Sequence, residues 1–373
     1  MISKEKLYAA IAMVLLASLT SLTYAARHMD ELRRSDMDFF TSEEASRIGE
    51  QVLAYQRITG GWPKNIDMCR LHSSEELDEV RMQRVRTDDS TTDNLATTTQ
   101  LRFVANMYQA THDERYRDSF NAGVEYLLSG QYDNGGWPQF WPNPEGYQVH
   151  ITFNDGAMVN TLVLLRDIAY ATYPYVDSIV DESIRSRSQA AFNKGIECIL
   201  ATQIRVNGTP TVWCQQHDSE TLAPAPARSY ELPSFCSQES VQIVSLLMEL
   251  TDPDERVIEA VHGAMKWFDA NKLTGYRLER TGQPKTSEAN VRLVADSDAG
   301  PLWGRFYDLE NCEIFVCDRD GIPRKSLEEI GQERRTGYSW YNSYPADLYS
   351  IYDQWADKYD PAGNVILGHD NAM

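Results

Sequence analysis

The stretch 55–65, YQRITGGWPKN, recurs as GQYDNGGWPQF at 130–140 and, as a weaker third copy, as TQIRVNGTPTVW at 202–213. The copies share one glutamine at equivalent positions 75 and 72 residues apart, which are Gln56, Gln131 and Gln203. Self-similarity on this scale indicates a structural unit that the chain builds more than once. The elements that flank each copy therefore predict the fold.

Each copy lies between two predicted helices. The helix before it has apolar residues three or four positions apart, the pattern of one buried face, and such helices are predicted at 42–57, 114–131 and 183–203. The helix after it is apolar on more of its surface, which is typical of a buried helix, and these are predicted at 92–110, 153–172 and 236–250.

This alternation predicts a mostly α fold, an (α/α) toroid or barrel built from about three repeated helix pairs with few short strands. The more apolar helices form the inner ring, and further helices predicted at 253–270 and 341–357 complete or cap it. We expect a single domain over residues 27–373.

Residues 1–26 are predicted to be a separate leader. Lys4 and Lys6 precede the apolar run LYAAIAMVLLASLTSLTYA, which ends in small residues near Ala25 and Ala26. This order is typical of a cleaved secretory signal peptide, and a permanent membrane anchor is the alternative. We expect a secreted or periplasmic protein, in which the six cysteines permit three disulfides without implying any.

The net charge is −20. Such a charge disfavours nucleic acid and anionic membrane surfaces as partners. An anionic substrate would need local cations, which arginines or a metal bound by carboxylates can supply.

Carboxylates recur where the predicted inner helices begin. The sequences TTDN, FNDG and SQES place polar pairs at Asp93/Asn94, Asn154/Asp155 and Gln238/Glu239. Helix capping is the ordinary reading of each residue alone. Small residues follow the first two pairs, and the helix starts would converge at one mouth of the toroid. A functional role is therefore favoured for Asp93 and Asp155, and both readings stay open for Glu239.

The GGWP turns combine chain reversal with a large apolar side chain. Trp62 and Trp137 are interpreted as structural plugs, and Lys64 and Asn65 as the better candidates for ligand contacts. Paired carboxylates in a helical toroid fit three chemistries: the acid and base of a glycosidase, oxygen ligands for calcium, or carbocation chemistry on a terpenoid. The sequence contains no GxSxG or HExxH motif and no glycine-rich phosphate loop.

Arginines supply the missing cations. The loop 221–232, TLAPAPARSYEL, carries Arg228 and Tyr230 just before the third predicted inner helix, so Arg228 is expected at the same mouth as Asp93 and Asp155. The stretch 303–342 adds arginines among aromatic residues, at Arg305, Arg319, Arg334 and Arg335. Guanidinium groups pair with carboxylates, so this composition suits an anionic carbohydrate. Pairing with surface acids is the alternative.

Several ordered motifs together resemble the pectate lyases of polysaccharide lyase family 10. They are GGWPKNID, TTDNLATTTQLRFVANMYQAT, GGWPQFWP, ITFNDGAMVN, TVWCQQHDSETLAPAPARSYE, WGRFYDL and ERRTGYSWY, and the resemblance extends from about 40 to 357. It implies an (α/α) toroid that cleaves α-1,4-linked polygalacturonate by calcium-assisted β-elimination and releases unsaturated oligogalacturonides.

The resemblance also implies residue roles. Asp93 and Asp155 would bind Ca²⁺, Arg228 would be the base, and Arg305 and Arg319 would pair with substrate carboxylates. Further substrate contacts are expected from Lys64, Asn94, Asn154, Tyr230 and Arg335. We expect a monomer whose partner is polygalacturonate, with no nucleic acid and no stable membrane association after leader cleavage.

A guanidinium is normally protonated. An arginine base therefore requires calcium and neighbouring arginines to lower its proton affinity, which predicts an alkaline optimum. Two alternatives stay open: a glycoside hydrolase that uses Asp93 and Asp155 as its acid and base, and an inactive pectin-binding homologue.

Overall fold

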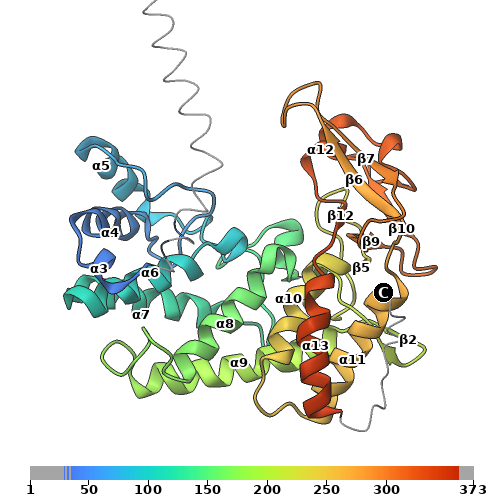
Figure 1. Cartoon of the computed structure of the whole chain (residues 1–373). Helices are drawn as coiled ribbons and strands as arrows, with labels where there is room; N and C mark the ends of the chain where they lie inside the picture. The colour runs from blue at the N-terminus through green and yellow to red at the C-terminus, as the bar shows by residue number, and fades with distance from the viewer. Residues whose placement is uncertain (1–28, 30–31, 33–34, 361–373) are drawn as a thin grey trace, which may run out of the picture. The chain divides into compact units, whose positions relative to one another are not determined.

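The computed structural model describes Met29, Leu32 and residues 35–360 (Figure 1). The predicted leader lies outside these residues and stays a prediction. The contacts within the chain divide it into two compact units. The first reaches Glu145 and resumes over Asp155–Gly195, and the second comprises Gly146–Asn154 and the chain from Ile196 onward. Each unit is described by itself.

The first unit is helical. Its elements are α3 (Met37–Phe40), α4 (Glu43–Tyr55), α5 (Ser74–Met82), η1 (Gln83–Val85), η2 (Asp93–Leu95), α6 (Thr98–Thr111), α7 (Glu114–Ser129), α8 (Ala157–Ala169) and most of α9 (Glu182–Thr202). Side-chain caps begin several of these helices, as where Ser42 accepts a hydrogen bond from the backbone of Ala45. Trp62, Leu101 and Phe120 lie fully buried in the core of this unit.

The second unit combines helices with short strands. Its helices are η3 (Gly146–Val149), α10 (Ser237–Met248), α11 (Glu255–Ala270), η5 (Leu327–Glu329), α12 (Gln332–Gly337) and α13 (Ala346–Tyr359), and η4 (Asn154–Gly156) crosses the boundary between the units. Its strands are β1 (Ile151–Thr152), β2 (Arg205–Val206), β3 (Thr209–Pro210), β4 (Gln216–His217), β5 (Phe235–Cys236), β6 (Tyr276–Thr281), β7 (Asn290–Ala295), β8 (Trp303–Gly304), β9 (Phe306–Tyr307), β10 (Ile314–Cys317), β11 (Pro323–Arg324) and β12 (Tyr341–Asn342).

These strands form several small antiparallel sheets. The largest has the order β11-β10-β9-β5, and the others are the pairs β6-β7, β12-β8, β1-β4 and β2-β3. The longest pairing is the β6–β7 hairpin (Figure 1), in which Leu278 lies opposite Leu293. Both leucines pack against the buried cluster that holds Phe306 and Trp340.

The prediction of an (α/α) toroid is wrong, although its individual helices are confirmed. Helices α4, α7, α9, α10 and α11 match the predicted ranges within two residues, whereas α6, α8 and α13 begin four to six residues later than predicted. The chain is instead divided into two units, and the second contains antiparallel sheets where a toroid would have further helix pairs. Helical periodicity predicted the local elements but not how they assemble.

The three repeat glutamines make the same pair of hydrogen bonds. Each side-chain amide donates to a carbonyl of the turn that follows the glutamine. It also donates to a carbonyl of a helix about 60 residues further along the chain, which is α7, α9 or α11. The acceptors are Gly60 and Ser119 for Gln56, Gly135 and Ala191 for Gln131, and Thr211 and Ala260 for Gln203, at 2.7–3.0 Å. The amide thus joins each copy to the next helix.

The repeat tryptophans make a second recurring bond. The indole nitrogens of Trp62, Trp137 and Trp213 donate to carbonyls of the preceding helix, at Val52, Leu127 and Ile199, over 2.7–2.8 Å. Trp303 makes the equivalent 2.8 Å bond to Phe268 of α11. All four rings are buried, so the interpretation of Trp62 and Trp137 as structural plugs is confirmed. Trp303 marks a fourth copy that the sequence repeat does not display.

Two further points bear on the sequence predictions. Within the described part of the chain, none of the six cysteines forms a disulfide bond with another. Among the described residues, no helix combines the length and apolar character that crossing a membrane requires.

We predict that Gln203→Leu lowers the free energy of unfolding by about 1–3 kcal/mol, because the carbonyl of Thr211 loses this donor and the hydrogen bond to Ala260 of α11 is removed. Urea denaturation followed by tryptophan fluorescence measures the change. The matched control is Gln189→Leu, since that amide donates only to the side chain of Asn193 one turn along α9. Equal effects of the two substitutions would contradict the role of the repeat amide.

Candidate active site

The structure gathers the predicted site residues into two groups. The aspartate group lies in the first unit and contains Lys64, Asp93, Asn94 and Asp155. The arginine group lies in the second unit and contains Asn154, Arg228, Tyr230, Arg305 and Arg319. Each group is described separately.

Asp93 is the buried centre of the aspartate group. Its Oδ2 atom accepts a short hydrogen bond from the ammonium group of Lys64 and another at 2.8 Å from the Gln139 amide. Its Oδ1 atom is buried and has no hydrogen-bond partner among the described residues. The Lys64 ammonium also lies 5.4 Å from the centre of the Phe140 ring. One carboxylate oxygen is therefore held by cationic and amide donors, while the other has no donor in the part of the chain that the structure describes.

The backbone of this group is unusual. Asn65, Asn94, Leu95, Thr97 and Asp155 all have positive φ angles, between 50° and 64°. Left-handed backbone at non-glycine residues costs about 1–3 kcal/mol each and clusters at functional sites. The Asn94 amide donates to the Asn65 side chain at 3.1 Å, which ties two of these residues together. The chain thus accepts local strain around Asp93.

Asp155 is exposed and lies in η4, two residues before α8 begins. Helix α8 packs against η2, the turn that carries Asp93, so the two predicted metal ligands lie on adjoining segments. None of the helices α6, α8 and α10 has a side-chain cap. The N-cap residues Thr97, Gly156 and Cys236 therefore lend the capping interpretation no support.

The aspartate group has the donor chemistry of a calcium site. Buried oxygens of Asp93 and Gln139 have no hydrogen-bond partner among the described residues, and calcium prefers carboxylate and amide oxygens. Within residues 35–360, no three His, Cys, Asp or Glu side chains form a ready metal cluster. These residues fit a site that needs further oxygen ligands from its substrate.

Arg228 forms a bidentate ion pair in the arginine group. Its Nε atom donates to Glu231 Oε2 at 2.7 Å, and its Nη2 atom makes a short bond to Oε1. The guanidinium lies 5.0 Å from the ring centre of Tyr230 and 5.7 Å from that of Tyr338. The Tyr338 hydroxyl donates to Glu231 at 2.7 Å. These contacts fix the guanidinium plane, and its Nη1 atom has no hydrogen-bond partner among the described residues.

The ion pair shifts both pKa values. Burial lowers the pKa of Arg228, but the hydrogen bonds and charge of Glu231 outweigh it, so the pKa of Arg228 is raised. Burial raises the pKa of Glu231, but the hydrogen bond and charge of Arg228 outweigh it, so the pKa of Glu231 is lowered. Both groups are therefore charged at neutral pH.

Arg305 is buried in the same group. Its Nη2 atom makes a short bond to Glu239 and a 3.1 Å bond to Asn154 Oδ1. Its guanidinium lies 4.6 Å from the centre of the Tyr338 ring. The thiol of Cys236 donates to the second oxygen of Glu239 at 2.6 Å. Glu239, whose role the sequence left open, is thus the counter-ion of Arg305.

Glu333 joins two more arginines to the group. It accepts two hydrogen bonds from Arg319, at 3.0 and 3.1 Å, and two from Arg334. Hydrogen bonds from Arg334 and Arg319 lower the pKa of Glu333 to about 2. The guanidinium groups of Arg334 and Arg319 lie 4.6 and 5.7 Å from the ring centre of Tyr230. Four guanidinium groups therefore lie close to the rings of Tyr230 and Tyr338.

Comparison with known proteins identifies the family of this chain. The family model for pectic acid lyase matches residues 56–349. The chain belongs to the pectic acid lyase family. A solved family 10 polysaccharide lyase from Cellvibrio cellulosa is 32% identical with a TM-score of 0.75, covering 89% of this chain and 96% of that one. An aspartate-to-alanine mutant of a family 10 polysaccharide lyase from the same organism, solved with trigalacturonic acid, has the same identity and TM-score over 90% and 98% of the two chains.

No curated protein gives a significant match. The resemblance seen in the sequence is confirmed, and this pectic acid lyase is a polysaccharide lyase that degrades pectate.

Arg335 does not join the arginine group of the pectic acid lyase. Its Nη1 atom donates to the backbone carbonyls of Leu327 and Ile330, at 3.4 and 3.2 Å. Its neighbour Arg334 contacts the tyrosines instead. Helix α12 points adjacent side chains in different directions, and the sequence alone gives no sign of which arginine of the pair faces the group.

Sequence reasoning also missed Glu231, Tyr338 and Gln139. A signal existed for Glu231, which follows Arg228 by three residues within the quoted motif. Tyr338 lies in the quoted motif ERRTGYSWY, but nothing local connects it with a glutamate 107 residues away. Gln139 follows the second GGWP turn and reaches Asp93 only through the folding of the first unit.

We predict that Glu231→Gln lowers the free energy of unfolding at pH 7 by about 1–2 kcal/mol. Loss of one partner of a fully buried pair costs about 3–5 kcal/mol, but the Arg228 side chain is 42% exposed and can recover hydration. Because the folded-state pKa of Glu231 is lowered, this stabilisation is complete above the unfolded pKa of about 4.3. It is lost as the pH falls through the folded pKa.

Chemical denaturation at about pH 7 and about pH 3 measures this difference. The matched control is Glu197→Gln, because the Glu197–Arg256 pair is also bidentate but both side chains are more than half exposed. It should cost less than about 1 kcal/mol at either pH. An equal cost in the two variants would show that burial of Glu231 contributes nothing.

Proposed function

We propose that this pectic acid lyase cleaves α-1,4-linked polygalacturonate by calcium-assisted β-elimination, with Arg228 as the base. The observation that carries the proposal is the gathering of Arg228, Arg305, Arg319 and Arg334 on two tyrosine rings in a chain of net charge −20. Such a concentration of guanidinium groups suits a polymer with a carboxylate on every sugar. The trigalacturonic acid in the similar Cellvibrio structure supports this substrate.

The reaction removes a weakly acidic proton. The C5 hydrogen of a galacturonate lies next to a carboxylate, so its removal builds a second negative charge on an enolate-like group. The C4–O bond then breaks, a C4–C5 double bond forms, and the departing oxygen takes up a proton. Groups that stabilise the charge where it develops lower the barrier. Arg305 and Arg319 would pair with the substrate carboxylates.

Asp93 and Asp155 would hold the calcium ion. When bound, calcium supplies positive charge that neutralises the substrate carboxylate and the charge that develops beside it. The buried oxygens of Asp93 and Gln139 without hydrogen-bond partners in the described part of the chain support this assignment. Lys64 would balance the charge of Asp93, and Asn94 and Asn154 would contact the sugar.

Glu231 orients the guanidinium of Arg228, although its charge opposes the lowered proton affinity expected from the sequence. The carboxylate binds Nε and Nη2, which leaves Nη1 as the nitrogen that would accept the C5 proton. The same pairing raises the pKa of Arg228, because Glu231 outweighs the effect of burial. The charged or titratable groups around Arg228 are Glu231, Tyr230, Tyr338 and Arg334. The neutral form is therefore a minor species whose fraction grows tenfold with each unit of pH.

Membership of a lyase family decides against the glycoside hydrolase that uses Asp93 and Asp155. An inactive pectin-binding homologue would bind polygalacturonate without turnover. Product analysis separates all three possibilities.

We predict that incubation with polygalacturonate releases products with unsaturated, ultraviolet-absorbing ends. Chelation should abolish the activity and added calcium should restore it. Asp93 and Asp155 alone provide too few oxygen ligands to hold calcium against a chelator. Saturated ends would indicate a hydrolase, and binding without products an inactive homologue. Asp93→Asn should raise the calcium concentration needed for half-maximal rate by about tenfold or more, since it removes one ligand charge.

We predict that log kcat rises with a slope near 1 from about pH 7 to about pH 10, since the raised pKa of Arg228 lies above this range. Arg228→Ala should lower kcat by about 100-fold or more. For Arg228→Lys, the plot of log kcat against pH should level off at a lower pH than for the native enzyme. The reason is that an amine has a lower pKa than a guanidinium.

The control for these variants is Arg256→Ala, which removes an exposed arginine from α11. It should leave kcat and its pH dependence unchanged. A native rate that is flat across this pH range would contradict an arginine base.

A further inference from the structure

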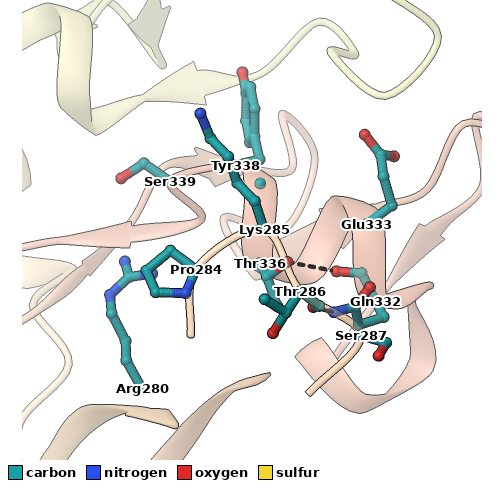
Figure 2. A pocket seen from close by; sticks show the side chains of 11 residues that line it. Arg280, Pro284, Lys285, Thr286, Ser287, Gln332, Glu333, Thr336, Tyr338 and Ser339 are labelled. Atoms are coloured by element: carbon teal, nitrogen blue, oxygen red, sulfur yellow. Dashed lines mark hydrogen bonds between the residues drawn. The ribbon is translucent and has the colours of Figure 1, made fainter. Parts of the chain in front are cut away.

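A cleft lies between the tip of the β6–β7 hairpin and helix α12 of the second unit. It encloses about 790 Å³, within the range of ligand sites. Figure 2 shows Arg280 and Pro284 on the hairpin side and Gln332 and Glu333 on the α12 side. Its other lining residues are Lys285, Thr286, Ser287, Thr336, Gly337, Tyr338 and Ser339.

The lining of this cleft carries spare positive charge. Arg280 and Lys285 form no ion pair with any residue that the structure describes. The one lining carboxylate, Glu333, is matched by Arg319 and Arg334 through four hydrogen bonds. In a strongly acidic chain, most other arginines of the second unit have acidic partners. The cleft therefore attracts an anion.

The hairpin tip is held in place beside α12. The side-chain amide of Gln332 donates to the backbone carbonyls of Thr286 and Ala289, at 2.8 and 3.0 Å. Lys285, immediately before Thr286, has a φ angle of 64°, in the left-handed region that lysine rarely adopts. Such conformations persist only where the surroundings impose them. The loop therefore presents Lys285 in a defined position.

The cleft shares a wall with the arginine group. Tyr338 lines the cleft, and its ring lies 4.6 Å from the guanidinium of Arg305. Its hydroxyl donates to Glu231, the partner of Arg228. Glu333 likewise lines the cleft while it binds Arg319. A polymer bound by the arginine group thus has an adjoining cationic surface along which to continue.

We propose that this cleft is an outlying subsite for galacturonate residues of the same polymer, beyond those at the cleavage point. The inference rests on the proposed function for the identity of the substrate. Arg280 and Lys285 bind the carboxylates, and the hydroxyl groups of Thr286, Ser287 and Ser339 offer hydrogen bonds to the sugar. The subsite raises the affinity for long chains and leaves the reacting sugar untouched.

The test compares steady-state kinetics on trigalacturonic acid and on long polygalacturonate. In the double variant Arg280→Ala/Lys285→Ala, KM for the polymer should rise about three- to tenfold, as expected for two partly exposed ion pairs. KM for the trimer should change less than twofold, so the ratio of the two values is the readout. An unchanged ratio, or an equal rise for both substrates, would overturn the proposal.

The matched control is Arg292→Ala. Arg292 lies on β7 of the same hairpin, pairs with Glu279 and does not line the cleft. It removes one positive charge from the same element, and the ratio should stay at the native value. A rise in the control would show that the effect comes from overall charge and would overturn the subsite. Failure of the native enzyme to cleave polygalacturonate would instead refute the proposed function.

Discussion

The side-chain amide of each repeat glutamine bonds two backbone carbonyls at once, one in a turn and one in a distant helix. One belongs to the turn that follows the glutamine, and the other to a helix about 60 residues further along the chain. A buried carbonyl without a donor is costly, so each amide fixes how a turn meets the next helix. The tryptophan of the same turn anchors it to the preceding helix. The segments that carry Lys64, Gln139 and the chain toward Arg228 all emerge from turns held in this way.

The rigid turns allow the candidate site to contain features that would be unfavourable elsewhere. Five residues around the aspartates have left-handed backbone, and Asp93 keeps an oxygen buried without a donor in the described part of the chain. In the second unit, the guanidinium groups of Arg228 and Arg305 each pair with a buried glutamate and lie near aromatic rings. Removing a charge from such a pair is costly. The groups are therefore positioned before substrate arrives, which is what stabilisation of a developing charge requires.

Much of the local structure could be predicted from the sequence. The ranges of eight helices followed from apolar periodicity, because helical bonds join near neighbours. The aspartates and Arg228 followed from the repeat and from the resemblance. The prediction of a toroid was wrong, because the strands of the second unit could not be recognised in the sequence. They are mostly two residues long and show no periodicity. Their pairing is decided by contacts such as Phe235 with Tyr307, which are far apart in the chain.

The sequence by itself determined the repeat, the helices, the pectic acid lyase family and the residue types available for chemistry. Only the tertiary structure decided which of those residues work together. It selected Arg334 over its neighbour Arg335, made Glu239 the counter-ion of Arg305, and brought Tyr338 to Glu231. The physical reason is that hydrogen bonds and ion pairs depend on distance in space. Residues separated by 66 or 107 positions acquire that proximity only when the chain folds.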